Sequence, residues 1–150
     1  MSGSFVSIGT HFIFSTKDRQ PFITDDISER IYSYIGGIIN SLDGIPIIIN
    51  GTSDHIHIYC FLPKEISVSR FIRIVKSRSS KWIHNTFPAK YRFKWQDGYG
   101  AFSVSKSIED RVIEYIKNQK EHHKDKSFKE EFLAILKKLN IEYNEKYIWV

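Results

Sequence analysis

Two histidines separated by one residue, His55 and His57, are the first candidates for chemistry in this sequence. They belong to residues 55–61, a run rich in apolar and aromatic side chains that predicts a strand. Residues two apart in a strand project from the same face, so both imidazoles point one way and Ile56 points the other. Paired neutral imidazoles can ligate a divalent metal when a third ligand comes from elsewhere. The alternative is two partly exposed strand histidines without a role.

A second candidate group lies on a helix predicted from Ser107 to about His123. Tyr115, Gln119 and His122 recur there at i, i+4 and i+7 and therefore share one face. A tyrosine phenol can attack a phosphodiester and form a phosphotyrosine, and a nearby metal would stabilise the developing charge. The carbonyl oxygen of Gln119 could complete a site begun by two histidines. The alternative is that Tyr115 is a core aromatic, because it also lies in the apolar stripe of the helix.

Positive charge is concentrated in the middle of the chain. The whole sequence has 22 lysine and arginine residues against 17 acidic residues, a net charge of +5. Residues 64–94 alone hold nine basic residues and one acidic residue. Such asymmetry predicts a polyanionic partner, of which nucleic acid is the usual one.

The basic residues of this segment lie mainly on a predicted helix, 67–84, where serines are interspersed with them. Small hydroxyl side chains between cations suit close approach to phosphates. The candidate DNA-binding residues are Arg70, Arg73, Lys76, Arg78 and Lys81. The aromatic side chains that follow, Tyr91, Phe93 and Trp95, could stack on unpaired bases. The alternative is an ordinary amphipathic helix with a solvated cationic face.

Hydrophobic patterning predicts the elements that position these groups, in the order β-α-β-β-α-β-α-α. The strands are expected at 5–15, 45–50, 55–61 and 98–105, and the helices at 25–42, 67–84, 107–123 and 127–139. Residues 45–50 are expected to form a buried strand. This order is typical of the split βαβ class. The fold class is therefore α+β, a ferredoxin-like or RRM-like antiparallel sheet with helices packed on it and an extra C-terminal helix.

Composition limits the class of protein. The 150 residues contain no repeat and no Pro/Gly-rich linker, so we expect a single domain spanning 1–150. No apolar run approaches the roughly 20 residues that span a bilayer, and residues 1–4 lack the features of a signal peptide, which favours the cytoplasm and no membrane contact. The single cysteine, Cys60, is expected on the face opposite the histidines, which disfavours a Cys–His nucleophile. The glycine motifs that bind nucleotide phosphates are absent.

Taken together, these motifs resemble a known family almost end to end. The family is that of the single-tyrosine HUH transposases of the IS200 type, which move small insertion sequences as single-stranded DNA. The resemblance is carried by residues 11–19, 55–57, 76–82, 95–105, 115–123 and 141–149. No single segment is decisive, but their order and spacing together are highly specific.

The resemblance implies a role for each candidate residue. His55 and His57 would be the metal-binding pair and Tyr115 the nucleophile. Gln119 would be the third metal ligand, although the histidine pair 122–123 leaves this position open. The resemblance also implies an RRM-like sheet, dependence on Mg²⁺ or Mn²⁺, and homodimers that recognise DNA hairpins near the element ends. In such a dimer the tyrosine helix of one subunit can complete the histidine site of the other.

The expected function is a DNA transposase that cleaves and rejoins single strands by transesterification, through a 5′-phosphotyrosine at Tyr115. Two other functions stay open. One is a host-adapted nuclease with the same chemistry, acting on repetitive palindromic DNA. The other is a non-catalytic, RRM-like module that binds single-stranded nucleic acid without forming a covalent adduct.

Overall fold

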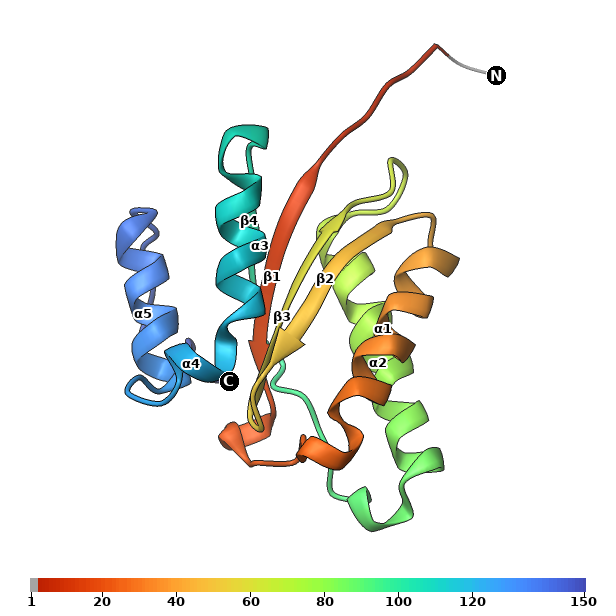
Figure 1. The fold of residues 1–150 in the computed structure, drawn as a ribbon, viewed down its shortest axis with the longest axis vertical. Coiled ribbons are helices and arrows are strands. Elements are labelled where there is room, and N and C mark those ends of the chain that lie inside the picture. Colours follow the sequence, from red (N-terminus) through yellow and green to blue (C-terminus); the bar gives the residue numbers. More distant parts are fainter. Residues whose placement is uncertain (1–2) are drawn as a thin grey trace.

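Four antiparallel strands form the central sheet of the protein (Figure 1). A computed structural model describes residues 3–150. Residues 1 and 2 belong to the segment in which the sequence showed no signal-peptide features, and they lie outside the described part. The strands are β1 (Gly9–Ser15), β2 (Ile45–Gly51), β3 (His55–Phe61) and β4 (Gly100–Ser103). Their spatial order is β2-β3-β1-β4, which places β1 and β3 in the centre of the sheet.

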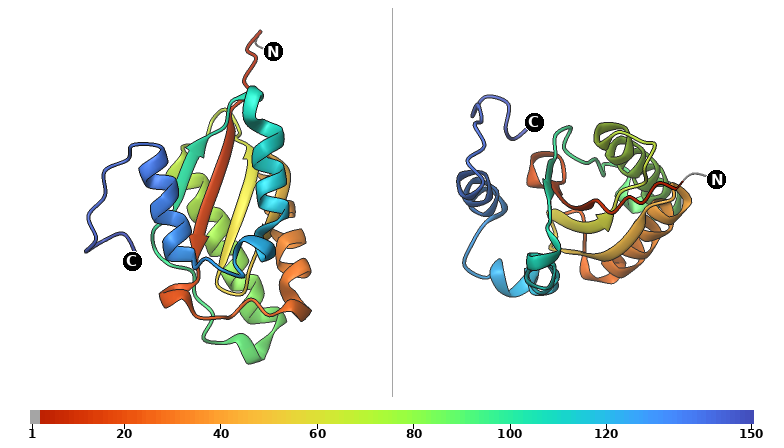
Figure 2. Two further views of the ribbon diagram at one scale, coloured as in Figure 1. Left: turned by 60° about the vertical axis from the view of Figure 1, so that its left-hand side comes forward. Right: turned by 90° about the horizontal axis from the view of Figure 1, so that it is seen from above.

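Helices cover both faces of this sheet. They are α1 (Asp25–Ser41), α2 (Val68–Thr86), α3 (Glu109–Lys117), α4 (Gln119–His122) and α5 (Phe128–Lys138). Helices α1 and α2 lie side by side on one face, and α3, α4 and α5 lie on the other (Figures 1 and 2). This arrangement confirms the predicted α+β class. None of the helices in residues 3–150 is long and apolar enough to cross a membrane.

The alternation of residues in β3 separates an apolar face from a polar one. Ile56, Ile58 and Cys60 are fully buried in the core that the sheet forms with α1 and α2. His55 and His57 project to the opposite face, toward residues of α4 and α5. The strand period of two residues predicted both placements.

A smaller apolar cluster holds α5 on the sheet. Phe128, Phe132 and Leu136 of α5 pack against Ile13 of β1, and Trp149 near the C-terminus packs against the same group. These helix positions lie four residues apart and therefore share one side of α5. The helix is thus fixed over the same face of the sheet as the two histidines.

Strand β4 is shorter at both ends than the expected 98–105, and two further strands differ from their predicted form. Strand β1 begins at Gly9, later than expected, because residues 5–8 are exposed and lie outside the sheet. Strand β2 was expected to be buried, but it is an edge strand in which Ile45 and Ile47 are 57% and 41% exposed. A short apolar run does not distinguish an edge strand from a central one, so the sequence could not show that β2 lies at the edge of the sheet.

The helix predicted over 107–123 is broken in two. Helix α3 ends at Lys117 and α4 begins at Gln119, because Asn118 between them has φ −99° and ψ 25°, close to the sparsely populated bridge region. Tyr115 and Gln119 therefore lie on either side of a bend rather than on one continuous helix.

Candidate metal centre and nucleophile

Three imidazoles and a carboxylate meet on the sheet face that α3, α4 and α5 cover. His55 and His57 come from β3, His123 follows α4, and Glu131 lies on α5. One donor atom from each of the four lies within 4.8 Å of the others. Imidazole nitrogens and carboxylate oxygens are the ligands that divalent metals take from proteins, so this cluster could hold such an ion.

Glu131 lies at the middle of the cluster, and it was not among the residues predicted from the sequence. Its Oε1 lies 3.0 Å from Nε2 of His57 and 3.4 Å from Nε2 of His55. In the helical pattern of α5 it belongs to the apolar side, with Phe128 and Phe132. A carboxylate within an apolar stripe is the signal that could have indicated it, because an acidic residue is rarely buried without a partner.

Gln119 and His123 approach the cluster from the two ends of α4. Oε1 of Gln119 lies 3.0 Å from Nε2 of His55, and Nε2 of His123 lies 3.1 Å from Oε1 of Glu131. Gln119 is fully buried, whereas His122 is exposed. The structure therefore brings Gln119 and His123 to the two strand histidines, and leaves His122 outside the donor set.

Further contacts orient the two strand imidazoles. Nδ1 of His55 lies 2.8 Å from Oδ1 of Asp54 and 2.9 Å from the hydroxyl of Thr52. Nδ1 of His57 lies 2.7 Å from Nε2 of His11 on the neighbouring strand β1. Because Nδ1 of each ring is engaged in this way, Nε2 is the atom that each presents to the cluster. Metal-ligating histidines are commonly held in this manner.

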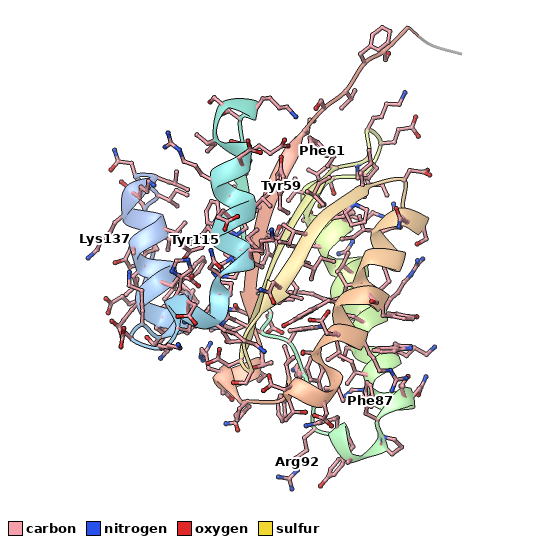
Figure 3. The ribbon with its side chains drawn as sticks, in the orientation of Figure 1. Tyr59, Phe61, Phe87, Arg92, Tyr115 and Lys137 are labelled. Carbon is pink, nitrogen blue, oxygen red and sulfur yellow. The ribbon has the colours of Figure 1, made fainter. Side chains whose placement is uncertain are left out.

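Tyr115 brings its hydroxyl group to the same cluster. From α3 the side chain points toward α5 (Figure 3), and its hydroxyl donates a hydrogen bond to Oε2 of Glu131. Its ring stacks on that of His122, with the centroids 4.5 Å apart. The side chain is half-buried, and its oxygen lies in a polar site. The alternative of a purely apolar core position for Tyr115 therefore does not describe the structure.

The buried carboxylate sets the electrostatics of the site. Burial alone would raise the pKa of Glu131, but the close contacts of its carboxylate with the three imidazoles outweigh it and hold this pKa well below its usual range. Burial and the nearby Glu131 charge raise the pKa of Tyr115, so the phenol keeps its proton in this arrangement.

The two strand histidines respond to burial differently. Burial lowers the pKa of His57 to about 4. It opposes protonation of His55 as well, but the carboxylates of Asp54 and Glu131 outweigh it and raise the pKa of His55 to about 9. The buried negative charge of Glu131 therefore favours a positive charge at this position.

The basic helix α2 lies on the opposite face of the sheet from this cluster (Figure 1). Four of its cations are exposed: Arg70, Arg73, Arg78 and Lys81. Lys76 differs, because its ammonium group donates to the main-chain carbonyls of residues 96, 97 and 98 at 2.9, 3.2 and 2.6 Å. Lys76 thereby joins α2 to the loop before β4, at a groove of about 450 Å³ that Arg73 and Lys94 also line.

Two of the three aromatic side chains expected to stack on bases are buried instead. Phe93 and Trp95 are 2% and 4% exposed, and Trp95 packs edge-on against Phe14 in the core. Nε1 of Trp95 donates to the Ser79 hydroxyl at 3.0 Å. Neither ring can face an unpaired base, so the expectation was wrong for both, whereas Tyr91 is exposed. The alternation of aromatic and basic residues did not indicate which of these side chains face the core.

The fold and the site define an α+β protein in which a tyrosine hydroxyl lies beside a histidine-rich cluster suited to a metal ion. Residues 4–119, which include both strand histidines, Tyr115 and Gln119, match the family model described as "Transposase IS200 like". The chain therefore belongs to the family of IS200-like transposases, which confirms the resemblance found in its sequence motifs.

Two curated relatives are the transposases for insertion sequence element IS200 of Salmonella typhimurium strain LT2 and of Salmonella typhi. Each is 35% identical to this chain over 77 residues, which cover 48% of this chain and 50% of the relative. The chain thus spans about half the length of the curated relatives it matches.

Two solved structures share the fold. A putative transposase from Deinococcus radiodurans R1 has a TM-score of 0.64 and 18% identity, over 79% of this chain and 95% of that chain. A REP-associated tyrosine transposase bound to a REP hairpin has a TM-score of 0.60 and 13% identity, over 82% of this chain and 73% of that chain. At these identities the likeness concerns the fold alone.

Proposed function

We propose that this protein cleaves and rejoins single-stranded DNA at insertion-sequence ends, as a metal-dependent, single-tyrosine HUH transposase of the cytoplasm. The observation that carries the proposal is the position of the Tyr115 hydroxyl beside donors that can hold a divalent cation. Membership of the IS200-like transposase family supports the same activity.

The proposed reaction is a transesterification at one DNA phosphate. The Tyr115 oxygen attacks the phosphorus, the bond to the 3′ oxygen breaks, and the products are a 5′-phosphotyrosine and a free 3′-hydroxyl. The phenol releases its proton to solvent as the new bond forms, while Oε2 of Glu131 holds the hydroxyl through its hydrogen bond, and the departing 3′ oxygen takes a proton from solvent. Attack of a 3′-hydroxyl on the phosphotyrosine later restores the phosphodiester and frees Tyr115. Because the phosphotyrosine conserves the bond energy, the reaction needs no nucleotide cofactor.

His55, His57 and Gln119 would hold the divalent cation, Mg²⁺ or Mn²⁺, at the centre of the cluster. When bound, the cation would polarise the phosphate and stabilise the charge that develops on it. Asp54 and His11 support this role, because each contacts Nδ1 of a strand histidine and keeps its Nε2 directed inward.

The proposed substrate is single-stranded DNA with hairpins near the element ends. One structural neighbour is a tyrosine transposase bound to a REP hairpin, which supports a hairpin as the class of ligand. We assign phosphate binding to the cations of α2, namely Arg70, Arg73, Lys76, Arg78 and Lys81, with Lys76 acting chiefly through the loop that it holds. One catalytic tyrosine per chain gives one covalent intermediate, so the handling of two DNA ends calls for a homodimer.

Replacement of His57 tests the metal-dependent chemistry separately from DNA binding. His57→Ala should abolish cleavage of a labelled hairpin oligonucleotide in Mn²⁺, because a buried donor is lost, and should leave hairpin binding largely intact, because α2 lies on the other face. His84→Ala, outside the cluster, is the matched control and should cleave like the wild type. Cleavage by His57→Ala at the wild-type rate would contradict the assignment.

A host-adapted nuclease acting on repetitive palindromic DNA is the second candidate, and the neighbour bound to a REP hairpin is the observation that favours it. Its chemistry would be the same, so the DNA around the gene is what separates the two. Paired ends with hairpins flanking the gene support the transposase, whereas dispersed palindromes without such ends support the nuclease. A non-catalytic module would bind the hairpin and form no covalent adduct.

A further inference from the structure

The carboxylate of Glu131 is buried against the strand histidines, on a side of α5 that is otherwise apolar. The residue is 2% exposed, and its Oε1 lies 3.0 Å from Nε2 of His57 and 3.4 Å from Nε2 of His55. Taking a carboxylate out of water is costly, and charges that are buried in proteins are paired or coordinate metals. Glu131 therefore needs partners at this position that offset its lost hydration.

His123 is an independent sign that a ligand belongs in the cluster. Its side chain is 9% exposed, and its Nε2 lies 3.1 Å from Oε1 of Glu131. This contact lacks the geometry of a hydrogen bond, and Nε2 has no hydrogen-bond partner among residues 3–150. Buried polar atoms without a partner are rare and require an explanation such as an ion. A ring nitrogen that faces a carboxylate oxygen and two further imidazoles is placed for a cation.

The two oxygens of Glu131 face different groups. Oε1 faces the imidazoles, whereas Oε2 accepts the hydrogen bond from Tyr115 and lies 3.3 Å from Nε2 of Gln119. Oε1 can therefore serve a cation while Oε2 keeps its contacts with the tyrosine and the amide.

We propose that Glu131, through Oε1, and His123, through Nε2, are direct ligands of the divalent metal, together with His55 and His57. The inference rests on the proposed function, because it concerns the metal of that same site. It adds an anionic ligand and a third imidazole to the set implied by the family resemblance. The side-chain amide of Gln119 then also stabilises the carboxylate through its contact with Oε2.

This assignment makes α5 part of the metal centre. The chain beyond α5 is fixed to the body of the protein, because Arg19 donates to the Trp149 carbonyl at 2.9 Å and the Gly98 amide donates to the Val150 carbonyl at 2.9 Å. Glu131 is thus held over the sheet by the helix and by the segment that follows it. Metal binding should in turn stabilise the C-terminal helix.

Calorimetric titration of the full chain with Mn²⁺ tests the proposal without relying on activity. Glu131→Gln keeps the size of the side chain and removes the ligand charge. We expect it to weaken Mn²⁺ binding by at least the roughly 10–100-fold that loss of an outer-sphere partner costs. The matched control is Glu130→Gln, which removes the same charge from an exposed neighbour and keeps the capping box with Ser127. This control should bind Mn²⁺ like the wild type.

The third imidazole is tested in the same way. His123→Gln should weaken Mn²⁺ binding by about tenfold or more, whereas His122→Gln, at the adjacent exposed position, should not. Affinities of Glu131→Gln and His123→Gln equal to those of their controls would overturn the proposal.

Thermal unfolding in EDTA shows whether Glu131→Gln is folded. If it is not, a measurement on the wild type tests the proposal instead. Crystals soaked in Mn²⁺ should give an anomalous peak in ligand contact with Oε1 of Glu131. A peak bound by His55, His57 and Gln119, without Glu131, would overturn the inference and leave the proposed function standing. Wild-type protein that binds no Mn²⁺ at all would contradict both, because the proposed cleavage depends on that metal.

Discussion

The side-chain amide of Asn50 donates a hydrogen bond of 3.0 Å to the main-chain carbonyl of Ile116, and this bond joins the edge strand β2 to the end of α3. A second bond, of 3.1 Å, reaches the carbonyl of Lys117. Carbonyls at the C-terminal end of a helix have no partner within it, so Asn50 closes α3 where the chain bends into α4. Tyr115 and Gln119 lie on the two sides of this bend, and Asn50 is therefore a positioning residue for both.

Asn50→Ala should slow phosphotyrosine formation more than it weakens hairpin binding. Loss of two hydrogen bonds costs roughly 1–3 kcal/mol of local stability, and a displaced nucleophile can react about 100-fold more slowly. The checks are the rate of adduct formation and hydrogen exchange of the amides in residues 115–119, which should quicken. Asn40→Ala, at an exposed position of α1, is the control. Unchanged exchange together with full cleavage in Asn50→Ala would show that β2 does not position α3.

Replacing Arg70 and Arg73 together by glutamine should weaken hairpin binding and flatten its dependence on salt. Both residues are exposed on α2, and each lost phosphate contact lowers the slope of log K against log salt by roughly 0.7 for a single strand. Lys76 is left in place because it bonds to main-chain carbonyls. The control removes two charges at the end of α5, from Lys137 (Figure 3) and Lys138. Equal slopes for the two double variants would mean that these α2 cations face bulk water.

The rings of Tyr115 and His57 from one chain have centroids 5.8 Å apart, so a single chain supplies both parts of the site. Two variants that are each expected to be inactive test whether a dimer keeps this arrangement. Tyr115→Phe retains the histidines, and His57→Ala retains the tyrosine. Mixing the two should give no cleavage if every site is built within one chain, as this geometry predicts. Restored cleavage would instead assign the tyrosine and the histidines to different subunits.

Much of the fold was predictable from the regular spacing of apolar and polar residues along the chain. The alternation in β3 predicted that Cys60 and His57 face opposite sides of the sheet, and the structure confirms it. The last helix was expected to begin at residue 127, and the structure confirms this start, because Ser127 and Glu130 form a capping box at the beginning of α5. The bend at Asn118 was not predictable in this way, because helical spacing continues through it and long-range contacts hold the chain on either side.

The site was predictable only where its residues share an element. Strand alternation grouped His55 with His57, but it could not show that His57 would meet Glu131 from 74 residues away. The contact of His57 with His11 likewise depends on the pairing of β1 with β3. Sequence spacing also could not show that Lys76 turns its charge to main-chain carbonyls, because that depends on the course of a distant loop.

The role of Tyr115 as the nucleophile can be tested separately from its role in folding by removing one oxygen atom. Tyr115→Phe loses the hydrogen bond to Glu131, so we expect it to fold and bind the hairpin with a stability loss of roughly 1–3 kcal/mol. Tyr143→Phe, which removes the same oxygen at a site partly exposed to solvent, is the matched control.

The most direct measurement is mass spectrometry of the protein–DNA adduct after incubation with a hairpin oligonucleotide and Mn²⁺, denaturation and proteolysis. Wild type and Tyr143→Phe should carry the DNA on the peptide that contains Tyr115, and Tyr115→Phe should carry none. A covalent adduct on another residue of Tyr115→Phe, such as Tyr99, would contradict the account.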